Sequence, residues 1–199
     1  MYNCCMAIKP PHLKKNDRVC IISPSAPITT EIKTNLNNGI ACVKNLGFDV
    51  ALAKNALSNT LGYSSTPQEK ANDINNAFSD KSINAIICSQ GGENANSILS
   101  LLNYELIRKN PKVFLGISDI TVLLVAIYQQ TGLITFHGND VIWGFGRNPT
   151  NYDVGEFIDR LVNGQTGKTK KNSVWKTIKA GQTTGTLIGG NLSCLTKLA

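Results

Sequence analysis

The sequence has few of the residues that metal and redox sites require. Its 199 residues include two histidines and six cysteines, with no Cys-x-x-Cys pair and no Cys/His pairing at zinc-site spacing. Two of the cysteines, Cys20 and Cys88, fall inside apolar runs, where a free thiol behaves as a small hydrophobic residue. This usage is typical of a reducing compartment. We therefore expect neither a metal ion nor an organic cofactor.

Long hydrophobic runs are also absent. Met1–Pro11 contains no continuous apolar segment of the kind found in signal peptides. No apolar run further along the chain is long enough to span a membrane. A hydrophobic content of 42% over this length is nevertheless sufficient for one sizeable core. The sequence thus predicts a cytoplasmic protein that has no membrane partner.

Charged residues are sparse and scattered. They make up 17% of the chain, and the formal net charge is +7. The densest basic run, Lys168–Lys171, lies in a segment rich in Gly, Thr and Asn, with Trp175 as the one nearby aromatic residue. Nucleic-acid binding requires a basic face with interleaved aromatic residues or a known module, and neither is visible. We expect no nucleic-acid partner and interpret this segment as a solvated connector.

Short β-prone runs alternate with segments of helical periodicity along most of the chain. The predicted strands are Val19–Ile22, Phe48–Leu52, Ile83–Cys88, Val113–Gly116 and Ile134–His137. The predicted helices are Thr30–Leu46, a helix that begins at Pro67, Glu93–Leu102, Asp119–Gln130 and Val154–Val162. Strands that alternate with helices form parallel βαβ units. The sequence therefore predicts an α/β fold: a doubly wound, mostly parallel sheet of the flavodoxin or Rossmann type, with helices on both faces.

The composition changes after Asn163, which divides the chain into an α/β domain over residues 1–163, a polar linker over 164–172 and a third part over 173–199. Within that third part, Ser173–Ile178 and Gly185–Ile188 are predicted strands, and a helix is expected from Gly189 onward. Twenty-seven residues are too few to bury a core of their own. We therefore expect residues 173–199 to be the start of a second, β-rich and incomplete domain.

Residues Lys112–Thr121 carry the most informative pattern, because an apolar strand runs into Gly-Ile-Ser-Asp and a helical pattern follows at once. Ser118 would lie at a helix N-terminus, where unpaired N–H groups and the helix dipole stabilise negative charge. Such a turn can present a serine Oγ as a nucleophile and supply part of an oxyanion hole. However, serine and aspartate are also ordinary helix caps, and the second glycine of a Gly-x-Ser-x-Gly elbow is missing. From this stretch alone, a helix cap is the favoured interpretation.

Three loops should meet at the carboxyl edge of the predicted sheet, where ligands bind in open parallel sheets: Ser23–Pro27, Ser89–Glu93 and Gly116–Asp119. In the second loop, Gly91 and Gly92 allow backbone N–H groups to approach an anion closely. A tight turn is an equally good interpretation of an isolated glycine pair. The pair is part of neither a Walker loop nor a dinucleotide-binding fingerprint.

One of the two histidines falls near this edge. His137 ends the fifth predicted strand and is followed by Gly138 and Asn139. Its imidazole could contact a substrate or act as a general base. A lone histidine at a strand end more often has a structural role, so the pattern by itself assigns it no chemistry.

Several of these segments together resemble the LD-carboxypeptidase family, which includes the microcin C self-immunity peptidases. The resemblance extends from about Lys14 to Ala199, and the run Asp17–Ser25 fits the family's first strand and loop. The Gly-Gly-Glu-Asn-Ala-Asn segment is closer to the microcin-immunity branch than to the muropeptide branch, which typically has Arg-Gly-Gly-Tyr-Gly there. The five matching segments, in spacing as well as identity, are Ser89–Asn96, Pro111–Lys112, Gly116–Thr121, Thr135–Gly138 and Gly189–Leu192.

The resemblance implies a serine peptidase with a Ser–Glu–His triad that cleaves an amide near a carboxyl terminus. Ser118 would be the nucleophile, and the backbone N–H groups of Asp119 and of the Gly91–Gly92 turn would bind the oxyanion. His137 matches a family segment that does not contain the catalytic histidine. The residues expected to contact substrate are Glu93, Asn94, His137 and Asn139.

The family's glutamate and histidine lie beyond the Gly-Gly-Asn-Leu motif, and this sequence has neither. Loss of triad members typically costs about 10⁴–10⁶-fold in rate. We therefore expect a truncated peptidase that is nearly inactive alone, with a peptide- or nucleotide-binding module and a degenerate fragment as the alternatives. A muropeptide and an aminoacyl-nucleotide remain equally open as substrates, and the family pattern favours a homodimer.

Overall fold

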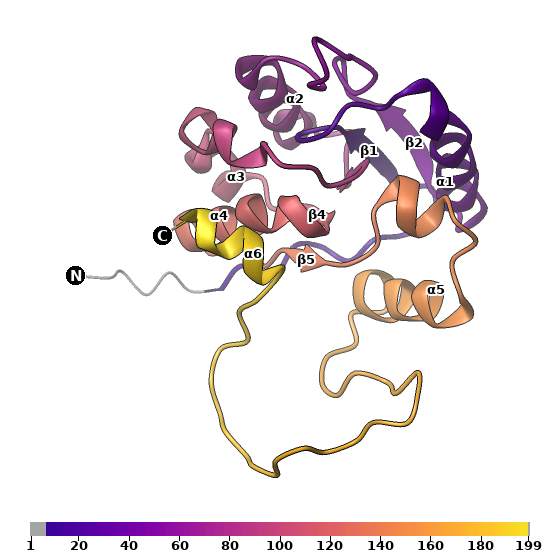
Figure 1. Cartoon of the computed structure of the whole chain (residues 1–199), viewed down its shortest axis with the longest axis vertical. Coiled ribbons are helices and arrows are strands. Elements are labelled where there is room, and N and C mark those ends of the chain that lie inside the picture. The colour runs from indigo at the N-terminus through magenta and orange to yellow at the C-terminus, as the bar shows by residue number, and fades with distance from the viewer. Residues whose placement is uncertain (1–6, 199) are drawn as a thin grey trace.

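A parallel sheet forms the centre of the molecule. The computed structural model describes residues 7–198 and contains five strands in the order β2-β1-β3-β4-β5 (Figure 1). Every neighbouring pair is parallel, with Ile22 opposite Cys88 and Gly116 opposite His137. The predicted doubly wound parallel sheet is therefore confirmed. The strands are β1 (Arg18–Ile22), β2 (Asp49–Leu52), β3 (Ala85–Cys88), β4 (Val113–Gly116) and β5 (Phe136–His137).

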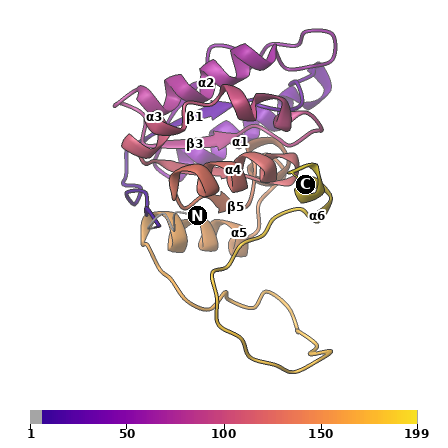
Figure 2. The same cartoon turned by 90° about the vertical axis from the view of Figure 1, so that its left-hand side faces the viewer.

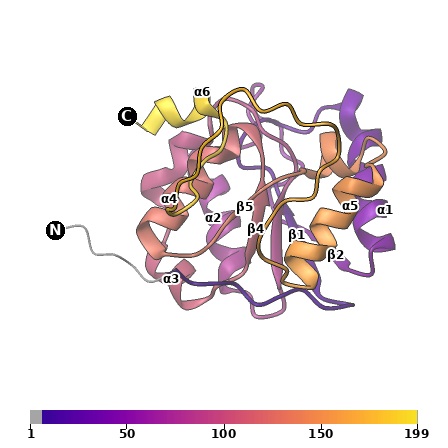
Figure 3. The same ribbon diagram turned by 90° about the horizontal axis from the view of Figure 1, so that it is seen from below.

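Helices cover both faces of this sheet (Figure 3). Residues of α2, α3 and α4 pack in one buried cluster with one face of the strands, and residues of α1, α5 and the π-helical turn η4 (Val141–Phe145) pack on the other. Successive residues of β1 alternate between the two clusters, as the pleat of a strand requires. The helices are α1 (Lys33–Asn45), α2 (Pro67–Ser79), α3 (Tyr104–Lys109), α4 (Thr121–Thr131), α5 (Asn151–Phe157) and α6 (Leu192–Leu195).

Local signals explain where α2 begins and how it packs. Thr66 and Glu69 form a reciprocal capping box, and Pro67 occupies the first helical position, where its missing N–H costs no hydrogen bond. The predicted inner face is confirmed, since the side chains that point to the sheet are all buried: Ala71, Ile74, Ala77 and Phe78. None of the helices within residues 7–198 is long and apolar enough to cross a membrane.

Two predicted strands, Ser173–Ile178 and Gly185–Ile188, are wrong. The structure contains no strand in residues 138–198, and residues 164–190, between η5 (Ile158–Val162) and α6, form a long loop that extends away from the sheet (Figure 2). Val174, Ile178 and Leu187 in this loop are 98–100% exposed. A β-prone sequence forms a strand only when a neighbouring strand pairs with it, and no described segment does so here. The division into a linker and a second domain stays a prediction.

Elsewhere the prediction differs in helix type or misses short elements. Glu93–Leu102 was expected as a helix, and the structure has a 3₁₀ segment, η2, over Ala95–Leu101. Two elements were not predicted, α3 and η4. Each has a polar cap: the Asn103 side chain accepts from Leu106 N–H, and the Asp140 side chain accepts from two N–H groups of η4. Both elements are too short for periodicity to reveal them.

The contact between α1 and η4 leads to a first prediction. A Cβ on Gly39 of α1 would lie 2.0 Å from the carbonyl oxygen of Val141, so Gly39→Ala should lower the free energy of unfolding by about 1–3 kcal/mol. Gly155 of α5 is the matched control, because a Cβ there meets nothing within 4 Å. Gly155→Ala should raise stability by up to about 1 kcal/mol. Urea denaturation of both variants measures the difference, and equal effects would contradict this packing.

Candidate active site

The carboxyl end of β4 turns sharply into α4, with Ser118 at the turn. Gly116 ends the strand, a 3₁₀ turn covers Ser118–Ile120, and α4 begins at Thr121. Ser118 has φ of 59°, a left-handed conformation that costs a non-glycine residue about 1–2 kcal/mol. Its side chain is half-buried. The structure therefore places Ser118 on a strained strand-to-helix elbow, the geometry that presents a nucleophilic serine.

Gly91 packs directly against this elbow. A Cβ on Gly91 would lie 2.8 Å from Cβ of Ser118, 3.1 Å from its Oγ and 3.4 Å from the backbone nitrogen of Asp119. Only a glycine permits this approach without displacing the serine. Three of the predicted site residues, Gly91, Ser118 and Asp119, are thus brought together, although they are separated by up to 28 positions in sequence.

Gly92 makes the contact with the loop that follows β1. Its φ is 150°, and a Cβ here would lie 2.3 Å from Oγ of Ser25 and 2.6 Å from the nitrogen of Ala26. The Ala26 N–H also donates to the carbonyl of Gly91 over 3.1 Å. The loops after β1, β3 and β4 therefore meet at the carboxyl edge of the sheet, as the sequence predicts.

The Asp119 side chain is at the centre of this meeting point, a feature that the sequence analysis missed. Its carboxylate is fully buried and accepts hydrogen bonds from Ser25 Oγ over 2.6 Å, from Ala95 N–H over 2.8 Å and from Lys197 Nζ over 2.8 Å. Burial raises the pKa of Asp119, but the hydrogen bonds from Lys197, Ser25 and Ala95 outweigh it and leave the pKa below its ordinary value. Asp119 is therefore ionised at neutral pH.

The Gly91–Gly92 turn is also held from the side of η4. The Ile142 N–H donates to the carbonyl of Ser89 over 3.0 Å, and the Trp143 indole N–H donates to Oε1 of Gln90 over 2.9 Å. Gln90 in turn donates to the carbonyl of Pro27. Both residues before Gly91 are therefore fixed by contacts to other elements, which makes the turn a preorganised part of the site.

The predicted substrate contacts are dispersed. Glu93 is exposed, and the Asn94 side chain accepts a hydrogen bond from Lys70. His137 is exposed and lines a cavity of about 800 Å³ between α4 and residues 186–190. Asn139, with His137, also lines a separate cavity of about 360 Å³ that α5 borders. Their roles toward a substrate stay predictions.

No described residue completes a nucleophile–base pair with Ser118. Within residues 7–198, neither a histidine nor a carboxylate accepts a hydrogen bond from its Oγ. The arrangement therefore supplies a positioned hydroxyl and nearby backbone N–H groups, without a general base among the described contacts of Ser118.

This elbow and its glycine turn lie inside the region that comparison with known families identifies. A model of the LD-carboxypeptidase N-terminal domain matches residues 19–138, and the chain belongs to this family. The chain is 34% identical to a probable murein peptide carboxypeptidase of Bacillus subtilis, over 94% of this chain and 58% of that one. It is 33% identical to the microcin C7 self-immunity protein MccF of Escherichia coli, over 92% of this chain and 61% of MccF. It thus spans less than two thirds of either relative.

Solved structures agree with this assignment. The wild-type apo form of MccF superposes with a TM-score of 0.81 at 30% identity, covering 98% of this chain and 65% of that one. An MccF-like protein from Bacillus anthracis gives 0.73 at 36% identity, over 78% and 47% of the two chains. Other MccF structures hold adenosine monophosphate, glutamyl sulfamoyl guanosine or aspartyl sulfamoyl adenosine.

The strain at the elbow gives the second prediction. Because a glycine adopts a φ of 59° without penalty, Ser118→Gly should be more stable than Ser118→Ala by about 1 kcal/mol. Ser100, an exposed residue of η2, provides the control. There the order should reverse, since glycine lowers the stability of a helical position by about 0.5–1 kcal/mol relative to alanine. Urea denaturation of the four variants measures their free energies of unfolding. The same order of glycine and alanine variants at both positions would show that the elbow is unstrained.

Proposed function

We propose that this chain contributes the nucleophile and the oxyanion-binding turn of a serine-type peptidase that cleaves an amide near a carboxyl terminus. One observation carries the proposal: Ser118 stands on a left-handed elbow with Gly91 packed against its Cβ and Oγ. A helix cap, the alternative from the sequence, accounts for neither the strain nor the glycine contact, since ordinary caps have extended backbone.

In the proposed reaction, Ser118 Oγ attacks the carbonyl carbon of the scissile amide. The negative charge that develops on the carbonyl oxygen is bound by backbone N–H groups of Asp119 and of the Gly91–Gly92 turn. Each such donor is typically worth about 3–4 kcal/mol in the transition state. A general base must take the proton of Ser118 and return it to the leaving amine, and family resemblance assigns this to a histidine that a glutamate orients.

The relatives support this reaction class in two ways. Their names include murein peptide carboxypeptidase and a microcin immunity protein, and MccF binds aminoacyl sulfamoyl nucleotides. One MccF structure is described as an active-site mutant in which a serine, an asparagine and a lysine are replaced by alanine. We propose a small peptide or an aminoacyl-nucleotide as the substrate of this site, with the carbonyl carbon of the scissile amide next to Ser118 Oγ.

Ligand binding separates the proposed site from catalysis and gives the third prediction. Calorimetry should show that the 199-residue chain binds aspartyl sulfamoyl adenosine, and that Ser118→Ala binds it equally well, because non-covalent binding does not need the Ser118 hydroxyl as a nucleophile. Gly91→Ala should weaken binding at least about tenfold, since its methyl group would occupy the space beside Ser118. Gly138→Ala is the control, because its Cβ would meet only the end of the Leu115 side chain, at 3.3 Å.

Hydrolysis of an LD-linked tetrapeptide and of an aspartyl-adenylate amide should stay near background for this chain alone. A clearly measurable rate that falls in Ser118→Ala would show instead that the chain is an active serine peptidase by itself. If the folded wild-type chain binds neither aspartyl sulfamoyl adenosine nor an LD-linked tetrapeptide, the proposed site loses its support.

A further inference from the structure

The buried Asp119 carboxylate joins four segments of the chain that are distant in sequence. One oxygen, Oδ2, accepts from Ser25 Oγ after β1 and from the Ala95 N–H at the start of η2. The other, Oδ1, accepts from Lys197 Nζ over 2.8 Å. Asp119 itself follows Ser118 on the elbow. Each carboxylate oxygen therefore holds a different part of the fold, and the second holds the segment after α6.

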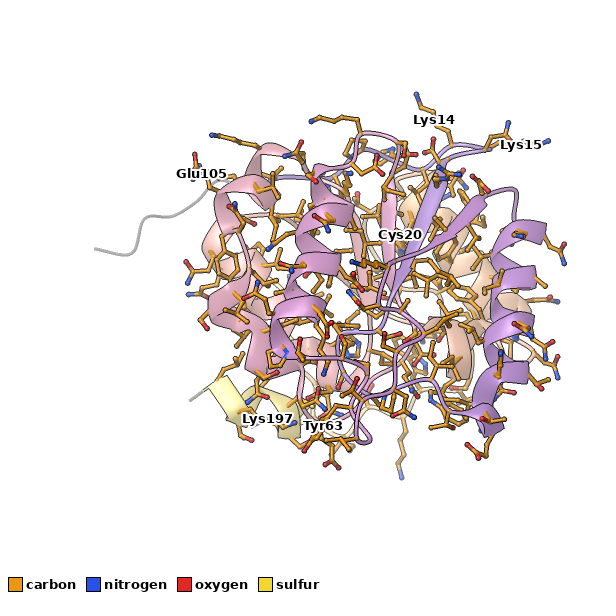
Figure 4. All side chains as sticks on the ribbon, turned by 90° about the horizontal axis from the view of Figure 1, so that it is seen from above. Lys14, Lys15, Cys20, Tyr63, Glu105 and Lys197 are labelled. Atoms are coloured by element: carbon orange, nitrogen blue, oxygen red, sulfur yellow. The ribbon has the colours of Figure 1, made fainter. Side chains whose placement is uncertain are left out.

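Lys197 contacts the oxyanion-binding turn as well as the carboxylate. Its Nζ donates a second hydrogen bond, over 3.2 Å, to the backbone carbonyl of Glu93, the residue that follows Gly91 and Gly92. A lysine ammonium has three donors, so one cation spans the elbow and the end of the turn. Figure 4 shows Lys197 at the end of the molecule opposite Lys14 and Lys15, which precede β1, and therefore at the carboxyl edge of the sheet.

The segment that carries Lys197 is anchored beside the elbow at two further points. The Asn191 N–H donates to Oγ1 of Thr121, the first residue of α4, over 3.0 Å. A Cβ on Gly190 would lie 2.4 Å from Cγ2 of the same threonine. Cys194 is buried in the cluster that α4 also joins. Lys197 thus reaches Asp119 from a docked segment rather than from a free tail.

Two lysines lie near the Asp119 carboxylate, Lys70 and Lys197. Lys70 is almost fully buried and donates to the side-chain oxygen of Asn94. The backbone N–H of Asn94 donates to Ser25 Oγ over 3.4 Å, so Lys70 makes no direct hydrogen bond to Asp119. Glu93 and Cys194 are the other titratable groups near Lys197. Lys197 is therefore the one described cation in direct contact with the carboxylate.

We infer that Lys197 is a positioning residue of the active site: through Asp119 and the Glu93 carbonyl it fixes the Ser118 elbow against the Gly91–Gly92 turn, and makes that alignment depend on docking of residues 190–198. That this alignment matters for catalysis rests on the proposed function. The alignment itself is a structural claim and can be tested without it. A docked carboxy-terminal segment would complete the oxyanion site, and its removal would loosen it. Lys197 acts through other groups and has no reacting atom of its own.

The experiment is a pH titration by NMR of the full 199-residue chain, which follows the carboxyl carbon of Asp119 and the amides of Gly91 and Gly92. Lys197→Met keeps an unbranched side chain one atom shorter and without the charge, Lys197→Arg retains the charge, and Lys179→Met in the exposed loop is the control. In wild type the three signals should share a midpoint below the ordinary aspartate value. Lys197→Met should raise that midpoint by about one pH unit or more and shift both glycine amides at neutral pH. In Lys197→Arg, both the midpoint and the glycine amide shifts should stay close to those of wild type.

The same variants are then tested for binding of aspartyl sulfamoyl adenosine, where Lys197→Met should weaken affinity about tenfold if each oxyanion donor loses part of its alignment. Hydrogen exchange of residues 190–198 should become faster in Lys197→Met and in Asp119→Asn. Glycine amide shifts and a carboxyl midpoint that are unchanged in Lys197→Met would overturn the inference, whether or not the ligand binds. Absence of ligand binding in wild type, with the midpoint shift present, would instead count against the proposed function alone.

Discussion

A buried carboxylate is the constraint on which the site depends. Transfer of an ionised aspartate from water into the protein costs several kcal/mol unless hydrogen bonds and a countercharge compensate for it. Asp119 is fully buried, and the fold supplies a hydroxyl from the loop after β1, a backbone N–H from η2 and the ammonium of Lys197. None of these donors can move away without leaving the charge uncompensated. The loops that form the candidate oxyanion site are therefore held together by the hydrogen bonds and the countercharge that the buried Asp119 carboxylate requires.

The strain at Ser118 becomes understandable in the same terms. A serine keeps a left-handed backbone conformation only when several contacts from the surrounding structure fix it there. Before it, β4 is buried and paired with strands on both sides; after it, Asp119 is fixed at both carboxylate oxygens. Gly91 fills the remaining space against the serine side chain. The elbow is therefore placed by long-range contacts, and the strained residue is the one that carries the candidate nucleophile.

The sheet could be predicted from the sequence because each strand carries a local signal. The run Ala85–Cys88 is continuously apolar, and Pro67 after Thr66 marks a helix start, so β3 and α2 follow from neighbouring residues alone. The alternation of such elements then fixes which loops share the carboxyl edge. Ser118, Gly91 and the N–H of Asp119 could be proposed on that basis and on the family resemblance, and the structure brings them together.

The Asp119 network could not be predicted in this way. Ser25, Ala95 and Lys197 lie 94, 24 and 78 positions from Asp119, and no local pattern relates any of them to it. The aspartate next to Ser118 also looks like an ordinary first-turn acid, so its side chain suggested a cap rather than a buried ion. The mistaken strands at Ser173–Ile178 and Gly185–Ile188 have a similar origin, because strand formation depends on a partner that local sequence cannot reveal.

A crystal structure of the chain with aspartyl sulfamoyl adenosine tests the central claim most directly. If Ser118 and the Gly91–Gly92 turn form the reaction site, the aspartyl carbonyl oxygen of the ligand should lie about 2.7–3.1 Å from a backbone nitrogen of Asp119 or of the turn. The carbon of that carbonyl should be within about 3.5 Å of Ser118 Oγ. A ligand bound only in the cavity beside His137, with Ser118 in contact with nothing but solvent, would contradict the account.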